Sequence, residues 1–277
     1  KSGTAISRFN EKISREHRRY FEVKHEILEA IQEDQITVSF HPQVTDGGVR
    51  GAEALLRWEH EKHGFLAPPQ VVQAACEMNY EKELLEHVLS TSMEVARDWR
   101  NDEILSVNVS SKHLQYEDRL IDVIRKTAES HDFPLRRLEV ELTEQAAVRD
   151  IDETREILAD LRSHGVSVSI DDFGTGYSSF TSLVKLPVDN LKIDKSFVLN
   201  LYEEEQNKRI VEATGQLAHG LELDVIAEGV ETEAHIGYLR ELGITLMQGF
   251  YWTEPLKAQE YQQFVQTFSE NGEGSGD

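Results

Sequence analysis

The stretch VSVSIDDFGTGYSS, residues 166–179, decides the fold of this chain. Its first part, residues 166–171, has the short apolar character of a buried strand and ends in two adjacent carboxylates, Asp171 and Asp172. A loop rich in Gly and Ser follows over residues 173–179. In barrels of alternating strands and helices, the residues that carry the chemistry stand at the C-terminal ends of the strands. The stretch therefore predicts a buried strand that delivers two acids to a functional site.

Five other apolar runs end in the same way, each in a polar residue suited to holding a metal ion or moving a proton. With the first, the six are Ala52-Glu53, Val107-Asn108, Val140-Glu141, Ile170-Asp171-Asp172, Leu191-Lys192 and Ala227-Glu228. Strands are predicted over residues 36–44, 50–58, 104–110, 137–142, 166–171, 189–193, 223–228 and 245–249. Helices are predicted near residues 68–79, 81–99, 117–130, 151–164, 203–219, 232–243 and 257–268.

The order of these elements predicts a barrel. The turn signal Asp46-Gly47-Gly48 joins the first two strands, so these two are expected to pair antiparallel. The other six strands alternate with helices, and right-handed crossovers close such a series into a barrel. The length of 277 residues fits, since about 250 residues are typical of this architecture. The predicted fold class is α/β, a modified (β/α)8 TIM-like barrel with an antiparallel first strand.

The barrel is expected to occupy residues 35–268. A leader or linker helix is expected before it in residues 1–34, and a disordered tail, acidic and rich in Gly, after it in residues 269–277. The sequence begins at Lys1 without Met, which is compatible with a fragment of a longer protein.

The composition limits the classes of partner. The formal net charge is −22, so most of the surface repels nucleic acid polymers and anionic membranes. No run approaches the ~20 apolar residues of a membrane span, and no N-terminal segment resembles a signal peptide. Cys76 is the single cysteine and lies in a helix-like pattern, where a core thiol is expected. We expect a cytoplasmic location, either alone or as the cytoplasmic part of a larger membrane-anchored protein.

The strand-end residues are expected to converge on one mouth of the barrel. The acids among them are Glu53, Glu141, Asp171, Asp172 and Glu228. Carboxylates packed so closely repel one another, and divalent cations remove that repulsion. Carboxylates with the amide oxygen of Asn108 suit Mg²⁺, Mn²⁺ or Ca²⁺ rather than Zn²⁺. Two ions bridged by one carboxylate suit in-line displacement at phosphorus.

Two basic residues complete this hypothesis. Lys192 could orient the attacking water or stabilise the phosphate, and Arg57 could clamp a phosphate oxygen, which Arg matches in geometry. Each residue alone also has a structural interpretation: Asp171-Asp172 as a turn, Lys192 as a residue that points to solvent. The hypothesis of a site depends on the whole set standing at strand ends.

The same residues carry a resemblance to a known family. Glu53-Ala54-Leu55-Leu56-Arg57 resembles the signature of the EAL-domain cyclic di-GMP phosphodiesterases. Further motifs follow in family order within about residues 36–266: Asn108-Val109-Ser110, Glu141-Leu142-Thr143-Glu144, Asp171-Asp172-Phe173-Gly174-Thr175-Gly176-Tyr177-Ser178-Ser179, Leu191-Lys192-Ile193-Asp194, Ala227-Glu228-Gly229-Val230-Glu231-Thr232 and Gln248-Gly249-Phe250. The resemblance implies a barrel with an antiparallel first strand. It also implies hydrolysis of cyclic di-GMP to linear pGpG with Mg²⁺ or Mn²⁺.

The resemblance further implies roles for individual residues. The first metal ion would be held by Glu53, Asn108, Glu141 and Asp171. The second would be held by Asp171, Asp172 and, directly or through water, Glu228. Lys192 would hold the attacking water. The catalytic residues implied by the resemblance are Glu53, Lys192, Asp172 and Glu228. Ca²⁺ is expected to occupy the site yet inhibit, because it holds water in looser geometry.

Substrate contacts are implied for Arg57, Gln248, Leu56 and Pro255. Glu144 would anchor the Asp171–Ser179 loop, and Glu231 would support the side of the second metal ion. That loop is expected to make homodimer contacts, with Thr175–Ser179 as a switch. An upstream sensor or GGDEF-type domain is a further expected partner.

Two positions depart from the family pattern. Phe40-His41-Pro42 stands where the family usually has Tyr-Gln-Pro, and Glu254 stands where a basic residue is common. No metal-site position is lost, which favours an active phosphodiesterase over a binding module that senses cyclic di-GMP without cutting it. A regulatory role in docking on another protein is compatible with either.

Overall fold

The computed structural model describes residues 19–100, 102–115, 119–175 and 183–272. The chain divides into two compact units, one of Lys1–Val38 with Leu56–Val88 and the other of Ser39–Leu55 with Leu89–Asp277. Two long strands, β1 (Ile36–Thr45) and β2 (Gly48–His60), contribute residues to both units.

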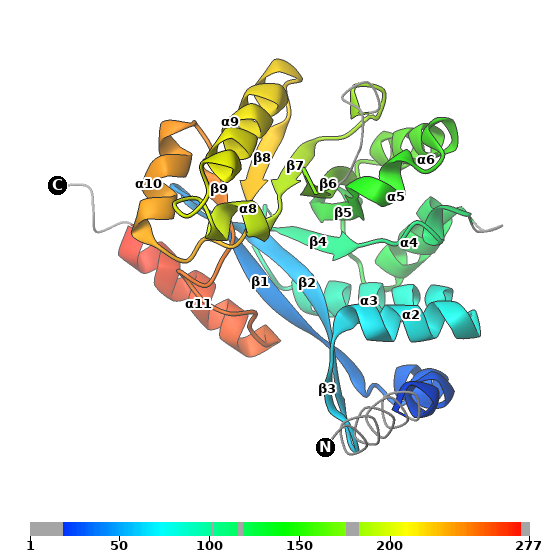
Figure 1. The fold of residues 1–277 in the computed structure, drawn as a ribbon. Coiled ribbons are helices and arrows are strands. Elements are labelled where there is room, and N and C mark those ends of the chain that lie inside the picture. Colours follow the sequence, from blue (N-terminus) through cyan, green and yellow to red (C-terminus); the bar gives the residue numbers. More distant parts are fainter. Residues whose placement is uncertain (1–18, 101, 116–118, 176–182, 273–277) are drawn as a thin grey trace, which may run out of the picture. The chain divides into compact units, whose positions relative to one another are not determined.

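Eight strands form a closed barrel (Figure 1). Besides β1 and β2 they are β4 (Ile104–Asn108), β5 (Leu138–Thr143), β6 (Ser167–Phe173), β7 (Asn190–Ile193), β8 (Asp224–Ala227) and β9 (Leu246–Met247). Neighbouring strands follow the order β1-β9-β8-β7-β6-β5-β4-β2, and a pairing of β1 with β2 closes the ring. All neighbours from β2 to β9 pair in parallel, whereas β1 pairs antiparallel with β9. The predicted fold class, including its antiparallel first strand, is confirmed.

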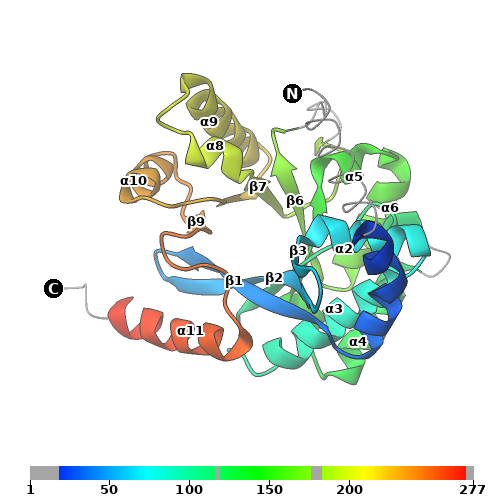
Figure 2. The same cartoon turned by 60° about the horizontal axis from the view of Figure 1, so that its bottom comes forward.

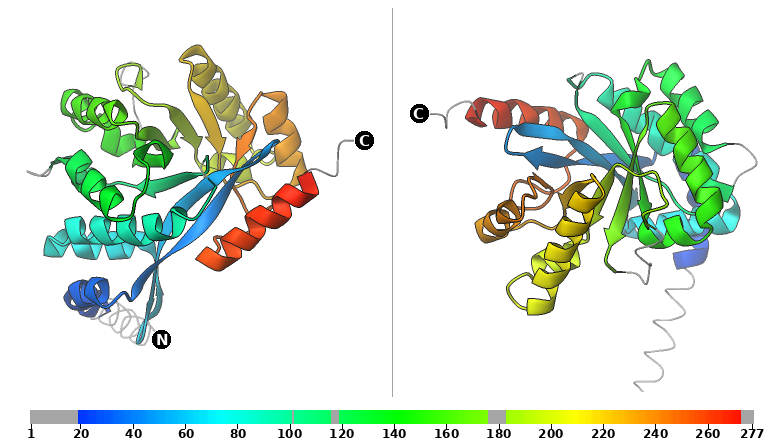
Figure 3. Two further views of the ribbon diagram at one scale, coloured as in Figure 1. Left: turned by 180° about the vertical axis from the view of Figure 1, so that it is seen from behind. Right: turned by 90° about the horizontal axis from the view of Figure 1, so that it is seen from above.

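Helices of the second unit lie outside the strands. They are α4 (Leu120–Ser130), α5 (Glu144–Val148), α6 (Ile151–Ser163), α8 (Lys195–Leu199), α9 (Glu205–Gly220), α10 (Glu233–Glu241) and α11 (Ala258–Gly272). Figures 2 and 3 show α5 and α6, in green, on a different side of the strands from α9, in yellow. Side-chain caps begin several of these helices: Asp150 accepts from the Glu153 N–H, and Thr232 accepts from the His235 N–H.

A layer of buried polar side chains lies inside the barrel, two residues before the strand ends. Glu139 accepts hydrogen bonds from Arg50 (Nη2 to Oε2, 2.6 Å), from the Ser106 hydroxyl (2.9 Å) and from the Asn190 amide. Arg50 also donates to Gln43 Oε1 at 2.6 Å. Because Ser106, Glu139 and Asn190 each precede a strand-end residue by two, strand alternation turns both sets to the same face.

The first unit consists of a helix over residues 19–32, β3 (Gly64–Leu66), α2 (Pro68–Met78) and the beginning of α3 (Glu81–Ala96). The helix falls within the predicted leader segment, and residues 1–18 of that segment lie outside the described residues. It contacts its unit through Lys24 to Glu77 (Nζ to Oε2, 2.8 Å) and through Glu22 to His63 (2.9 Å).

Cys76 corrects an expectation, because its side chain is half-buried and does not lie in the core. The buried stripe of α2 is Val71, Ala74 and Ala75, and one further residue turns the thiol off that stripe.

The sequence did not predict the short elements β3, α5 and α8. Helix α11 runs to Gly272, beyond the predicted end at residue 268, and Ser269 donates to the Val265 carbonyl one turn earlier. The rest of the predicted tail, residues 273–277, lies outside the described residues. Within the described ranges, every helix is too short or too polar to cross a membrane.

Candidate functional site

Lys192 stands at the centre of the strand-end acids. Its side chain is 0% exposed, and its Nζ lies 2.6 Å from Glu141 Oε2 and 2.7 Å from Glu228 Oε1. Glu53 Oε2 and Asp171 Oδ1 each lie 3.4 Å from the same nitrogen. Four carboxylates thus surround the ammonium of Lys192, which lies on β7. They come from β2, β5, β6 and the residue just after β8.

Hydrogen bonds fix the carboxylate of Glu53 within this cluster. Asn108 Nδ2 donates to Glu53 Oε1 at 2.6 Å, and Gln248 Nε2 donates to Glu53 Oε2 at 2.9 Å. The same Gln248 nitrogen lies 2.8 Å from His41 Nδ1, so His41 accepts there with its other ring nitrogen protonated. His41, which stands where the family usually has Gln, is therefore linked to the Glu53 carboxylate through Gln248.

The protonation of the cluster follows from its burial. Burial raises the pKa of Glu141 well above its usual range, and the Glu53 carboxylate adds to the shift. Burial also raises the pKa of Glu228 to about 8, against the attraction of Lys192. For Lys192, burial works in the opposite direction, but the carboxylates, Glu141 foremost, raise its pKa well above the usual range. The ammonium is therefore charged while some of its acidic neighbours carry protons.

The pKa of Glu53 is shifted in the direction opposite to those of Glu141 and Glu228. Although burial raises its pKa, the Lys192 charge and the hydrogen bonds from Gln248 and Asn108 together hold it below the usual range. Glu53 therefore stays ionised at neutral pH.

Asp171 and Asp172 lie where β6 departs from regular pairing. The register between β6 and β7 shifts between Ile170 and Phe173, and Asp172 has a left-handed φ of 55°. Asp171 Oδ1 accepts a hydrogen bond from the Asp172 N–H at 2.8 Å. Burial, with repulsion from Asp171 and Asp194, raises the pKa of Asp172 to about 6. The irregular backbone thus places two consecutive carboxylates at the C-terminal end of β6.

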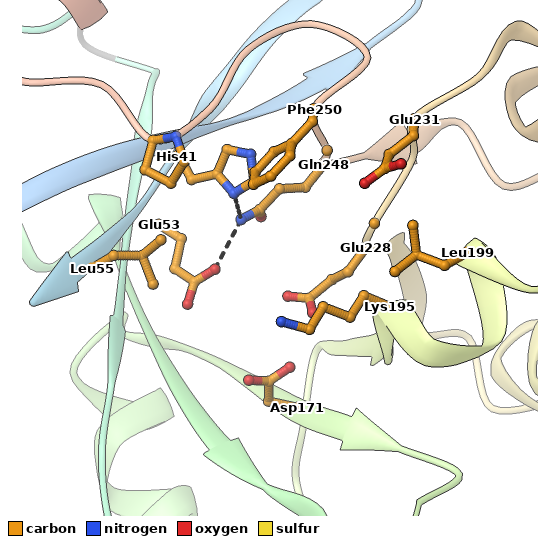
Figure 4. Close-up of a pocket in the computed structure, with 13 residues that line it drawn as sticks. His41, Glu53, Leu55, Asp171, Lys195, Leu199, Glu228, Glu231, Gln248 and Phe250 are labelled. Atoms are coloured by element: carbon orange, nitrogen blue, oxygen red, sulfur yellow. Dashed lines mark hydrogen bonds between the residues drawn. The ribbon is translucent and has the colours of Figure 1, made fainter. Parts of the chain in front are cut away.

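A cavity of about 440 Å³ opens beside the cluster (Figure 4). Its lining residues are His41, Glu53, Leu55, Asp171, Lys195, Leu199, Glu228, Gly229, Glu231, Gln248, Gly249, Phe250 and Pro255. The cavity gives a ligand access to three of the strand-end acids.

The remaining predicted residues are distributed as follows. Glu231 and Pro255 line the cavity, and Glu144 Oε2 accepts a hydrogen bond from the Gly174 N–H at 3.0 Å. That bond ties Glu144 to the start of the Asp171–Ser179 loop, of which residues 176–179 lie outside the described residues.

Leu56 as a substrate-contact residue stays a prediction, although it is not among the residues that line the cavity. Its side chain is buried, and Leu55 lines the cavity instead, because successive residues of a strand face opposite sides and Leu55 shares the face of Glu53. Arg57 belongs to the first unit, where it is half-buried and donates to the Leu56 carbonyl at 2.9 Å; it is not among the lining residues.

Besides Leu55, sequence reasoning missed other lining residues as parts of a site, among them Lys195, Leu199 and Phe250. Lys195 and Leu199 are the ends of the unpredicted helix α8, and they directly follow the predicted strand of Lys192. The signal that could have found them was the Asp194-Lys195-Ser196 sequence, since Asp194 accepts from the Ser196 N–H as a helix cap.

The donor set fits divalent cations that prefer oxygen. Four carboxylates and the Asn108 amide come from separate strand ends, and Glu141 Oε1 is buried with no hydrogen-bond partner among the described residues. In the part of the chain that the structure describes, no three His, Cys, Asp or Glu side chains are already grouped to hold a metal ion. The Lys192 ammonium lies between the acids and already supplies one positive charge to them.

Comparison with known proteins adds a family and several relatives. Residues 24–255 match the sequence model of the EAL domain. The bifunctional diguanylate cyclase/cyclic di-GMP phosphodiesterase MucR of Pseudomonas aeruginosa is 36% identical over 85% of this chain and 35% of its own length. The cyclic di-GMP phosphodiesterase NbdA of the same organism is 34% identical over 89% of this chain and 32% of its own length. The chain thus spans about a third of these curated relatives.

Solved structures share the fold. The PaMucR phosphodiesterase in a c-di-GMP complex superposes with a TM-score of 0.82 at 36% identity, covering 87% of this chain and 99% of that one. The EAL domain of Mycobacterium smegmatis DcpA superposes with a TM-score of 0.69 at 32% identity, covering 84% of this chain and 96% of that one.

Proposed function

Because the chain belongs to the EAL-domain family, we propose that it hydrolyses one phosphodiester bond of cyclic di-GMP to give linear pGpG, with Mg²⁺ or Mn²⁺ as cofactor. The observation that carries the proposal is the gathering of Glu53, Glu141, Asp171 and Glu228 around one point at the mouth of the barrel. The adjoining cavity supports it, since the ligand must reach those acids.

The strand-end residues have distinct parts in this reaction. Glu53, Asn108, Glu141 and Asp171 would hold one ion, and Asp171, Asp172 and Glu228 the other. Bound divalent ions supply positive charge that favours an attacking water and neutralises charge developing on the phosphate. Gln248 fixes the direction of the Glu53 carboxylate, and Asn108 does so from the other oxygen.

Lys192 is the residue that would orient the water. Its ammonium is buried among acids and keeps its proton. Its three donors face Glu53, Glu141 and Glu228, and ions that bind these acids would free a donor for the water oxygen. In the reaction the water oxygen bonds to phosphorus while the bond from phosphorus to the 3′ oxygen breaks. One water proton ends on the 3′ hydroxyl, and the other leaves with the new terminal phosphate or to solvent.

The test is direct. Purified protein is incubated with cyclic di-GMP and Mg²⁺ or Mn²⁺, and pGpG is sought by chromatography, with Glu53→Ala as the control. Appearance of pGpG with the parent alone supports the proposal. Binding of cyclic di-GMP without any pGpG would reassign the chain to the second candidate, a sensor module. That candidate is favoured by the Lys192 ammonium, which lies among the proposed metal ligands.

A homodimer through the region of the Asp171–Ser179 loop stays a prediction; within the chain, the Glu144 bond to Gly174 couples the start of that loop to the end of β5. An upstream sensor or GGDEF-type domain and inhibition by Ca²⁺ also stay predictions.

A further inference from the structure

Lys195 stands out among the residues that line the cavity. The lining includes four acids, Glu53, Asp171, Glu228 and Glu231, and Lys195 is the one lysine or arginine among its described members. In a chain with a net charge of −22, a lysine at the mouth of an acidic cavity concentrates positive charge where an anionic ligand would enter.

The side chain of Lys195 is exposed, and Figure 4 shows it extending into the cavity alongside Glu228. No carboxylate in the described part of the chain forms an ion pair with it, in contrast to the buried Lys192. Its three N–H donors are therefore available to a ligand.

The position of Lys195 is fixed by the backbone around it. Gly229, directly after Glu228, has a φ of +72°, and a Cβ built there would lie 2.6 Å from the Lys195 Cβ. Only glycine lets the segment after β8 approach α8 so closely. Leu199, four residues along α8, also lines the cavity, so one face of this helix is turned towards it. Lys195 is thus held at the cavity by packing and not by a partner charge.

We propose that Lys195 binds a phosphate of the cyclic dinucleotide. The inference rests on the proposed function, because it takes cyclic di-GMP as the ligand. A cyclic dinucleotide carries two phosphodiester anions, and the strand-end acids can receive phosphate only through bound cations. An ammonium supplies a direct charge-assisted contact. Lys195 thereby explains how an acidic cavity accepts an anion.

The test compares Lys195→Gln with Lys126→Gln, which removes the same charge from the exposed surface of α4, away from the cavity. Lys195→Arg is the conservative variant. Binding of cyclic di-GMP is measured by calorimetry in Ca²⁺, with chromatography to show that the ligand stays intact. The titrations are done at about 50 mM and about 300 mM NaCl, where screening lengths differ. Turnover is measured separately in Mg²⁺.

We expect Lys195→Gln to raise Kd and KM about tenfold at low salt, the size of a lost hydrogen bond to a charged group at a partly exposed site. Its kcat should stay near the parent value, because the contact acts equally on bound substrate and transition state. Lys195→Arg should restore binding, and Lys126→Gln should bind like the parent.

A Kd for Lys195→Gln equal to that of Lys126→Gln would overturn the inference while leaving the proposed function standing. So would a fall in kcat with Kd unchanged. A parent protein that neither binds nor cleaves cyclic di-GMP would instead refute the proposed function itself.

Discussion

Replacing Lys192 by Met tests whether the buried ammonium holds the strand-end acids together. Met keeps the length and much of the volume of the side chain but removes a positive charge that lies within 3.4 Å of four carboxylates. Removing one partner of a buried ion pair costs about 3–5 kcal/mol, because the remaining charges stay buried without compensation. We expect the free energy of unfolding of Lys192→Met, measured in EDTA near pH 8, to fall by that amount.

The pH dependence of this loss has a definite sign. The pKa of Lys192 is raised in the folded protein, so its contribution is fully present below the ordinary lysine value of about 10.4 and covers the neutral range. In Lys192→Met, which lacks this ammonium, the buried acids of the folded protein take up protons more readily than they do in the unfolded chain. Stability then falls as pH rises, by about 1.4 kcal/mol per pH unit for each extra proton bound by the folded state. The difference between parent and variant should therefore narrow towards about pH 5.

Urea unfolding followed by circular dichroism measures both effects, with Lys126→Met as the matched surface control. Added Mg²⁺ should recover more stability in Lys192→Met than in the parent, because the ion restores positive charge that the parent already has. A variant as stable as the parent at pH 8 in EDTA would refute the role of Lys192 as internal counter-ion. An equal gain from Mg²⁺ in both proteins would show that the ion does not compensate for the missing ammonium.

Four further outcomes follow from the same geometry. Glu53→Ala should abolish pGpG formation in Mg²⁺, since a carboxylate that stays ionised is lost; turnover at the parent rate would remove the acid cluster from the mechanism. Ca²⁺ should support binding of cyclic di-GMP but little hydrolysis, and chromatography after incubation in Ca²⁺ alone checks this. Glu139→Gln should destabilise the fold by about 3 kcal/mol in urea, because the Arg50 guanidinium, whose side chain is 20% exposed, loses its partner charge. The pKa of Glu228 is raised to about 8, so its contribution to the stability of the metal-free protein is present below the ordinary value near 4.3 and is lost as pH rises through about 8. Glu228→Gln, which cannot ionise, should lose less stability than the parent over that window, and a pH series of thermal unfolding in EDTA measures the difference.

The barrel was predictable because parallel strands impose a simple rule on the sequence. Each buried strand reads as a short apolar run, and its C-terminal end meets those of its neighbours at one rim. A polar residue at the end of such a run, as in Ala52-Glu53 or Ala227-Glu228, therefore marks the rim without any knowledge of long-range contacts. The turn at Asp46-Gly47-Gly48 fixed the direction of β1 by the same local logic.

The parts that the sequence did not yield depend on distances across the barrel. Lys192 was assigned to a water molecule, and nothing local shows that its ammonium reaches Glu141 and Glu228. Leu56 was chosen over Leu55 although alternation from Glu53 would have selected Leu55. Helix α8 was not predicted because Lys195–Leu199 is too short to show helical periodicity. Lys195 was therefore not recognised as a residue of the cavity.

The two polar layers inside the barrel differ in charge balance, and this is why we propose a site in the outer one. In the inner layer a single carboxylate, Glu139, faces the single guanidinium of Arg50, and Ser106 and Asn190 complete its hydrogen bonds. In the outer layer four carboxylates face one ammonium beside a cavity. A layer in which positive and negative charges are equal in number has no need to bind protons or ions from solvent. An excess of buried negative charge must be neutralised by protons or by cations. Polar alternation along the strands produces both layers, and the charge imbalance at the open end is the reason we propose that the outer one binds metal ions.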